Sequence, residues 1–301
     1  MPRKPEIRLF VTDLDNTLYD WVSYFARSYY EMIRVAAEIM YIPVEDLLDD
    51  VQRVHRRFNN TEHPFALLDT DAAKLAFPRL TRIERAQRLD RAFHAFNRTR
   101  KQTLSLYSSV RETLEQVAQS GAIVVAHTDA HAVNAAYRLK WLGLDALFDN
   151  VYAPEGEEHG HPRLARWESL DDVSCKVRSL AHTERKPSPR VLMTICRDYG
   201  ISPEHTLYVG DSLVRDVGMA KAIGAQAAWA RYGTRYDHAL LADVGRITHW
   251  TPEQVRREKG GGRQQSEARP DVELELYGEL LAAFSFSGEA RQRPVTHKKA
   301  A

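Results

Sequence analysis

The chain has 301 residues, of which 44% are hydrophobic and 28% are charged, a balance typical of soluble globular proteins. Its formal net charge of +1 gives no general reason to expect binding to a nucleic acid polymer or to a membrane. No apolar run approaches the roughly 20 residues of a membrane-spanning helix, and no apolar core of a secretory signal follows the basic start of the chain. The two cysteines, Cys175 and Cys196, show no metal or redox spacing, so we expect a cytoplasmic protein.

An apolar stretch at residues 7–11 predicts a buried strand, and two aspartates follow it directly. Because side chains alternate along a strand, Asp13 and Asp15 start on the same side of the chain. Two carboxylates at the end of a buried strand are costly to hold there. We therefore expect a cation beside them or a proton to transfer, although a solvated strand end with a capping aspartate is the simpler alternative.

Residues 20–107 show helical patterns without a strand pattern, and we predict an all-helical insert. Apolar side chains recur at helical spacing from Trp21 to Ile39. Pro43 ends that helix and opens another over residues 44–58, which has acidic residues in its first turn. A loop is predicted at residues 59–64, and one long charged helix over residues 81–104.

After residue 108, helical segments alternate with short apolar strands. We predict strands over residues 122–126, 148–152, 206–209 and 225–230, and helices over residues 110–119, 133–142, 187–199 and 216–223. Strands that alternate with helices form a parallel sheet with right-handed crossovers. The predicted fold class is therefore α/β, with a discontinuous core formed by residues 1–19 and 108–290.

Polar side chains follow three of the predicted strands. Asp13, Thr128 and Asp211 each stand where an apolar strand ends. In open parallel sheets the ligand crevice lies beyond the carboxyl ends of the strands. We therefore expect these three residues to meet in one site.

Two stretches look loosely structured. Residues 156–185 are polar and rich in histidine and charged side chains, and residues 257–271 are glycine-rich and read as a flexible linker or loop. We predict a last helix over residues 272–284 and a disordered basic tail over residues 291–301.

Four segments of the chain, taken in order, resemble the motifs of the haloacid dehalogenase superfamily. They are Asp13-Leu14-Asp15-Asn16-Thr17, Val124-Val125-Ala126-His127-Thr128-Asp129, Lys186-Pro187, and Gly210-Asp211-Ser212 with Asp216 five residues after the first aspartate. The resemblance implies a Rossmann-like doubly wound parallel sheet with an inserted helical cap.

The resemblance also implies a role for each motif residue in phosphoryl transfer. Asp13 would be the nucleophile that forms an aspartyl phosphate. The ligands of a catalytic Mg²⁺ would be the Asp13 and Asp211 side chains and the backbone carbonyl of Asp15, and Asp216 would orient waters or a lysine.

The same resemblance assigns the phosphate-binding groups. The hydroxyl of Thr128, the backbone amide of Asp129 and the ammonium of Lys186 would hold the phosphate oxygens. Three simpler readings stay open: Asp216 could cap the helix after it, Lys186 could be a solvated loop residue, and Asp129 could be a turn residue that contributes only its backbone.

The residue type at the position of Asp15 differs between the branches of the family. Asp15 would protonate the leaving oxygen and then activate water. The dehalogenase branch lacks an aspartate here and the family ATPases carry threonine, so Asp15 favours a phosphatase or a phosphomutase.

The helical insert stands between the first and second motifs, where the family carries its C1 cap. A cap that closes over the site excludes water and selects small substrates, so we expect a small phosphorylated metabolite. The first motif, together with Asn134-Ala135, Leu142-Gly143-Leu144 and Phe148-Asp149, is similar to pyrimidine 5′-nucleotidases, which slightly favours a nucleotide monophosphate. The alternatives are a phosphomutase that uses the same residues and a non-catalytic binding or regulatory protein with this fold.

Overall fold

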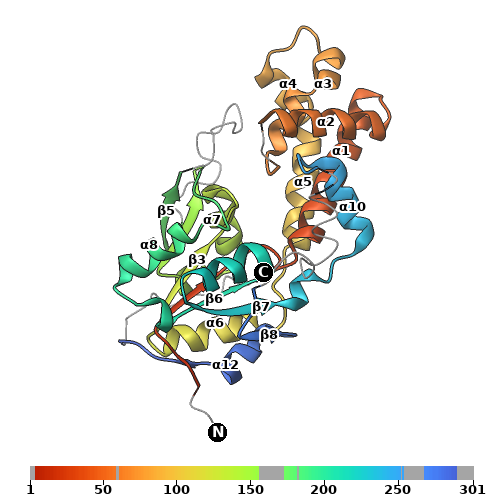
Figure 1. The fold of residues 1–301 in the computed structure, drawn as a ribbon. Helices are drawn as coiled ribbons and strands as arrows, with labels where there is room; N and C mark the ends of the chain where they lie inside the picture. The colour runs from red at the N-terminus through yellow and green to blue at the C-terminus, as the bar shows by residue number, and fades with distance from the viewer. Residues whose placement is uncertain are drawn as a thin grey trace.

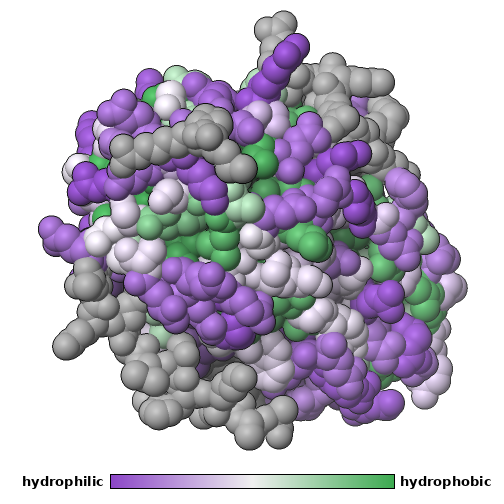
Figure 2. Space-filling view, turned by 90° about the horizontal axis from the view of Figure 1, so that it is seen from below, coloured by the Kyte–Doolittle hydropathy of each residue, from purple (hydrophilic) through white to green (hydrophobic). Residues whose placement is uncertain are grey.

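A computed structural model describes residues 4–58, 61–155, 173–181, 183–251, 253 and 268–289 of the chain. Figure 1 shows a sheet flanked by helices in the lower part of the molecule and a separate group of helices above it. On the face shown in Figure 2, hydrophilic and hydrophobic side chains are interspersed, and the hydrophobic ones gather in small patches. In the described part of the chain, no helix has both the length and the apolar character needed to cross a membrane.

The sheet has seven parallel strands in the order β5-β4-β3-β2-β6-β7-β8. The strands are β2 (Leu9–Thr12), β3 (Ile123–His127), β4 (Asn150–Pro154), β5 (Lys176–Leu180), β6 (Thr206–Gly210), β7 (Gln226–Ala230) and β8 (Val272–Leu274). The first of these strands in the chain, β2, lies in the middle, and later strands are added on both sides of it. This arrangement confirms the predicted α/β, doubly wound Rossmann-like fold.

Two apolar layers cover the faces of the sheet. Because side chains alternate along β2, Phe10 belongs to one layer, whereas Leu9 and Val11 belong to the other. Helices α6 (Val110–Gln119) and α7 (Ala132–Trp141) contribute to the Phe10 layer, while α8 (Pro189–Tyr199) and α9 (Gly218–Ala222) contribute to the other. The Phe10 layer continues without interruption into the helices above the sheet.

The upper group contains α1 (Trp21–Met40), α2 (Val44–Phe58), the 3₁₀ turn η1 (Pro64–Asp69), α3 (Asp71–Ala76), α4 (Arg82–Arg88) and α5 (Asp90–Thr103). Asp20 caps α1 by accepting a hydrogen bond from the backbone N–H of Ser23 at 2.9 Å. The single helix predicted over residues 81–104 is instead two helices. Fully buried Leu89 ends α4 and precedes α5, with a backbone outside the helical region.

Helix α10 (His238–Ile247) comes from the C-terminal half of the chain but packs against α1 and α2 in the upper group (Figure 1). The Gln52 side chain donates to the Gly245 carbonyl at 2.7 Å, and Nδ1 of His55 lies 2.7 Å from the Ile247 carbonyl oxygen. The ring of Trp250 lies 5.8 Å from that of Trp21. A segment that the sequence-based boundaries assign to the core is therefore attached to the helical insert.

Two expectations for single elements are wrong. Strand β5 lies within residues 156–185, which were expected to be loosely structured. It is a mostly exposed edge strand, in which the alternation of polar and apolar side chains breaks off after three residues. The helix predicted over residues 272–284 is replaced by β8, a 3₁₀ turn (Tyr277–Glu279) and the short helix α12 (Leu280–Ala283), and strand β9 (Ser285–Phe286) follows. Strand β9 pairs with β1 (Glu6–Ile7), a contact between the two ends of the described chain.

Several predicted segments lie partly or wholly outside the described residues. The flexible linker predicted at residues 257–271 is described only from residue 268 onward, and the predicted tail at residues 291–301 is not described. The described end of the linker region is anchored to the sheet, because the Asp271 N–H donates to the Ala227 carbonyl at 2.8 Å.

Candidate active site

The candidate site lies at the carboxyl edge of the three central strands. Asp13 follows β2, Thr128 follows β3 and Asp211 follows β6. The N–H of Asp13 donates to the Val209 carbonyl at 2.8 Å, so Asp13 still follows the sheet ladder, and the N–H of Thr128 donates to the Tyr152 carbonyl at 3.1 Å. These hydrogen bonds fix the starting points of the loops that carry the site.

Lys186 joins the first and last motifs. Its Nζ contacts Oδ1 of Asp13 and lies 2.9 Å from Oδ1 of Asp216. The exposed fractions are 7% for Lys186, 6% for Asp13 and 1% for Asp216. A buried ammonium between two carboxylates does not fit a solvated loop lysine. The hydroxyl of Thr17 donates to the second Asp13 oxygen at 3.1 Å, which fixes the carboxylate plane.

Asp216 does not cap a following helix, because its carboxylate points back toward the loop. Its Oδ2 accepts the N–H of Ser212 at 3.0 Å while its Oδ1 faces Lys186. The residue lies in a π-helical turn (Leu213–Val217), a local geometry often found at functional sites. A Cβ on Gly210 would lie only 2.3 Å from the Asp216 carboxyl carbon, so glycine is required to bring this carboxylate against the strand end.

The pKa values of Asp13 and Lys186 follow from their burial and from the opposite charges close to them. Burial raises the pKa of Asp13 to about 7, against the attraction of the Lys186 ammonium. Burial alone would lower the pKa of Lys186, but Asp13 and Asp216 outweigh it and the pKa lies well above its usual value. The lysine is therefore held in its charged form.

Three carboxylates gather where a divalent cation could bind. Oxygen atoms of Asp13, Asp211 and Asp216 all lie within 4.8 Å of one another. Oxygen-only ligands of this kind suit Mg²⁺. The Tyr236 hydroxyl donates to Oδ2 of Asp211 at 3.2 Å, and the Trp229 indole donates to its backbone carbonyl at 2.8 Å, so the Asp211 loop is held in place. The donor set fits the metal that the motifs imply, and the part predicted for the Asp15 carbonyl stays a prediction.

Asp15 points toward a different group, an arginine that the sequence analysis missed. Oδ1 of Asp15 lies 2.8 Å from NH1 of Arg138, and NH2 of the same guanidinium contacts Oε1 of Glu62. Arg138 lies on α7 and is 1% exposed. Glu62 lies between α2 and η1, in the helical insert. The guanidinium thus bridges a carboxylate of the sheet domain and one of the insert.

Glu62 is itself held by donors from both parts of the molecule. The Trp21 indole donates to Oε1 at 2.6 Å, and the Asn134 amide donates to Oε2 at 2.8 Å. Asn134 and Arg138 stand four residues apart on α7, so they share a helix face. That spacing after the second motif was a signal for a polar pair, but nothing in the sequence pointed to Glu62.

Burial and the shared arginine shift the two carboxylates in opposite directions. Burial raises the pKa of Asp15, with Arg138 opposing it and Glu62 adding to it. Burial would also raise the pKa of Glu62, but the attraction of Arg138 and the hydrogen bond from Trp21 prevail and lower it. Glu62 is therefore the partner that stays ionised.

Thr128 and Asp129 lie beside this centre. The Thr128 side chain is buried, and its oxygen accepts the N–H of Ala130 at 3.0 Å. Oδ1 of Asp129 accepts the N–H of Lys186 at 3.1 Å, and Oδ2 lies 2.6 Å from NH2 of Arg215. The Asp129 side chain therefore ties three motif loops together, beyond the backbone contribution expected of a turn residue.

Glycine at position 233 permits a close approach that the sequence analysis also missed. A Cβ there would lie 1.7 Å from the Asn16 carbonyl oxygen, in the loop after β2. The neighbouring Tyr232 hydroxyl donates to the Thr17 carbonyl at 2.6 Å. The 3₁₀ turn Arg231–Thr234 thus supports the loop that carries Asp15.

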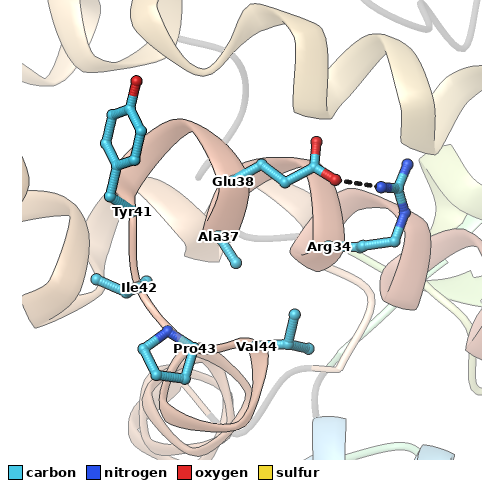
Figure 3. Close-up of a pocket in the computed structure, with 7 residues that line it drawn as sticks. All are labelled: Arg34, Ala37, Glu38, Tyr41, Ile42, Pro43 and Val44. Atoms are coloured by element: carbon cyan, nitrogen blue, oxygen red, sulfur yellow. Dashed lines mark hydrogen bonds and ion pairs between the residues drawn. The ribbon is translucent and has the colours of Figure 1, made fainter.

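A surface pocket lies elsewhere, at the turn from α1 into α2 (Figure 3). It is lined by Arg34, Ala37, Glu38, Tyr41, Ile42, Pro43 and Val44. Arg34 and Glu38 pair with each other at its edge, and the Tyr41 ring points away from the other lining residues. None of the predicted site residues lines it.

The chain is similar in sequence to known hydrolases. Residues 7–224 match the family described as haloacid dehalogenase-like hydrolase. Phosphoglycolate phosphatase 1 of Pseudomonas aeruginosa is 35% identical over 126 residues, which cover 38% of this chain and 42% of that protein. Glyceraldehyde 3-phosphate phosphatase of Methanopyrus kandleri is 25% identical over 77% of this chain and 87% of its own length.

Among solved structures, a 2-haloacid dehalogenase from Pseudomonas syringae pv. Tomato DC3000 has a TM-score of 0.56 at 19% identity, and the match covers 92% of this chain and 97% of that one. This likeness supports the fold alone. The alignments with three of the curated relatives span 42%, 22% and 60% of those proteins' lengths. On the extent of the family match, the chain belongs to the haloacid dehalogenase-like hydrolases.

Proposed function

We propose that this chain is a Mg²⁺-dependent phosphoric monoester hydrolase that acts on a small phosphorylated metabolite through an aspartyl phosphate on Asp13. The observation that carries the proposal is the buried contact of Asp13 with Lys186, beside Asp211 and Asp216, at the carboxyl edge of the sheet. An oriented carboxylate beside an ammonium is suited to attack an anionic phosphorus centre.

In the first step, an oxygen of Asp13 attacks phosphorus and the bond to the leaving oxygen breaks. Asp15 gives its proton to that oxygen, so the alcohol leaves uncharged. In the second step, Asp15 removes a proton from water, the water oxygen attacks phosphorus, and the bond to Asp13 breaks to release inorganic phosphate. Lys186, the Thr128 hydroxyl and the amide of Asp129 hold the phosphate oxygens throughout.

The carboxylates of Asp13 and Asp211 would hold Mg²⁺, with Asp216 positioning Lys186 and bound waters. When bound, the cation neutralises the charge between the attacking carboxylate and the phosphate. The chain's own residues supply the nucleophile, the proton and the phosphate contacts.

The presence of Asp15 supports a phosphoester substrate over a carbon–halogen bond, because only the former needs a proton at the leaving oxygen. The relatives named for phosphoglycolate and for glyceraldehyde 3-phosphate support a substrate of a few carbon atoms. The similarity to pyrimidine 5′-nucleotidases makes nucleotide monophosphates the third candidate. We place the reaction in the cytoplasm, in keeping with the free, buried Cys175 and Cys196.

The test is hydrolysis of p-nitrophenyl phosphate by the parent and by Asp13→Asn, with Mg²⁺ and with EDTA. We expect phosphate release only from the parent with Mg²⁺. Equal release by both proteins would refute the Asp13 mechanism, and inactivity of the parent on a panel of phosphoesters would favour a binding protein. Transfer of phosphate between positions of a sugar, without free phosphate, would identify a mutase instead.

A further inference from the structure

The position of the leaving group is set by Asp15. If Asp15 gives a proton to the leaving oxygen, that oxygen must lie within hydrogen-bonding distance of its carboxyl group. The Asp15 side chain is 24% exposed, and Arg138 and Glu62 lie directly beyond it, exposed by 2% and 13%. The part of the substrate that departs must therefore meet the charges of this group.

Both terminal amino groups of the Arg138 guanidinium are already paired. One amino group of the Arg138 guanidinium pairs with Asp15 and the other with Glu62. The guanidinium also lies over the Tyr24 ring, with its central carbon 5.2 Å from the ring centroid. An anionic group on the substrate that pairs with either amino group must displace one of the two carboxylates.

The Glu62 carboxylate is held in place by several hydrogen bonds. It accepts hydrogen bonds from Trp21, Asn134 and Arg138, which come from both the insert and the sheet domain. Three donors on one mostly buried carboxylate hold it in a single orientation. Its negative charge is therefore a fixed feature of the leaving-group side of the site.

The other nearby cations in the described structure are also engaged. Lys186 forms ion pairs with Asp13 and Asp216. The Arg100 guanidinium lies over the Tyr137 ring at 3.8 Å from its centroid. Among Asp15, Glu62 and Arg138, two carboxylates share one guanidinium. His131 is a further basic group near Glu62, and its Nδ1 lies 3.1 Å from the Glu155 carbonyl oxygen.

We propose that the Glu62–Arg138 pair selects phosphomonoesters with an uncharged leaving group and disfavours those whose leaving group bears a carboxylate. A sugar, a triose or a nucleoside would be accepted, whereas phosphoglycolate would be a poor substrate. The inference rests on the proposed function and names the substrate class of the same site. A ligand carboxylate placed beside the Glu62 carboxylate is disfavoured by like-charge repulsion.

The experiment compares two ligands that differ only in charge, 2-phosphoglycolate and its amide. For the parent, kcat/KM should favour the amide by about tenfold or more. Glu62→Gln keeps the shape and the hydrogen-bonding capacity but removes the charge, so it should lower that preference by about tenfold. Glu38→Gln, an exposed carboxylate on α1 paired with Arg34, is the matched control and should leave the preference unchanged.

A preference that is the same in the parent and in Glu62→Gln overturns the inference, even if both enzymes are active. If Glu62→Gln does not fold, equal kcat/KM values of the parent for the two ligands overturn it. If the parent hydrolyses neither ligand nor any other phosphoester, the proposed function fails. In that case, calorimetry of both ligands with the parent and Mg²⁺ still tests the inference. Weaker binding of phosphoglycolate than of its amide supports the inference, and equal or tighter binding refutes it.

Discussion

Arg138 connects the reacting end of the site to the helical insert through two carboxylates. A buried ion pair of this kind costs desolvation energy, which is recovered only while both partners are present. Asp15 and Glu62 share one guanidinium, so removal of the arginine leaves two partly buried carboxylates without their cation. A substitution of Arg138 should therefore lower both the activity and the stability of the protein.

Replacement of Arg138 by methionine should lower kcat at least about 100-fold, since Asp15 is no longer held in place, and should cost about 3–5 kcal/mol of unfolding free energy. Arg138→Lys keeps the charge but not the two-pronged geometry, so it should fall between the parent and Arg138→Met. Urea unfolding and steady-state kinetics measure the two effects. Parent-like kcat in Arg138→Met would show that Asp15 does not depend on this contact.

Gly210 is the second residue on which the site geometry depends. A methyl group there would lie 2.3 Å from the Asp216 carboxyl carbon, so Gly210→Ala must push Asp216 away from Lys186. We expect a loss of about 1–3 kcal/mol of unfolding free energy from overpacking and a clear fall in kcat. Gly218→Ala is the matched control, because its nearest contact is 3.4 Å away and it should be tolerated. Equal behaviour of the two variants in unfolding and kinetics would contradict this account.

Helix α10 is held by contacts with helices that are distant in the sequence, α1 and α2. Nδ1 of His55 on α2 donates a hydrogen bond to the Ile247 carbonyl at the end of α10, which requires the tautomer protonated at Nδ1. Burial lowers the pKa of His55 to about 4, because the charged ring would lose its hydration. The folded protein therefore keeps this ring neutral at a pH where the unfolded chain would protonate it.

The contribution of His55 to stability should be present above its unfolded pKa of about 6.5 and be lost as the pH falls toward 4. At pH 4.5 this loss should reach about 2–3 kcal/mol. Urea unfolding between pH 7.5 and 4.5 measures it, with His55→Gln as the comparison. The variant should show a shallower fall of stability with pH, and an unchanged slope would mean that His55 is not the group responsible.

The sequence was sufficient for elements with a local pattern. Strands β2, β3 and β6 are apolar runs, and the motif residues at their ends were placed correctly at one edge of the sheet. Edge strand β5 was missed because its alternation of polar and apolar side chains extends over only three residues. The contact of Arg138 with Glu62 was missed for a related reason, since a pairing between distant segments depends on how the insert folds over the sheet and leaves no periodic signal.

At the scale of the whole molecule, the helical insert is attached to the sheet domain at more than its two ends. Helix α10 leaves the sheet domain after β7 and the turn Arg231–Thr234, docks on α1 and α2, and shares one continuous apolar cluster with them. Tyr236, just before α10, donates to the Asp211 carboxylate. Any movement of the insert must therefore carry α10 with it and act on the segment beside Asp211.

This arrangement predicts that α10 opens together with α1 and α2 and not with the sheet strands that precede it in the chain. Cooperative units of a protein follow packing and not chain order. In native-state hydrogen exchange, the free energy of opening of the α10 amides should therefore fall with urea concentration as it does for the amides of α1 and α2. Peptides from β6 and β7 serve as the reference. Trp250→Ala removes the ring contact with Trp21 and should lower the protection of α10 before that of β7. Exchange of α10 in step with β7 would show that the helix belongs energetically to the sheet domain.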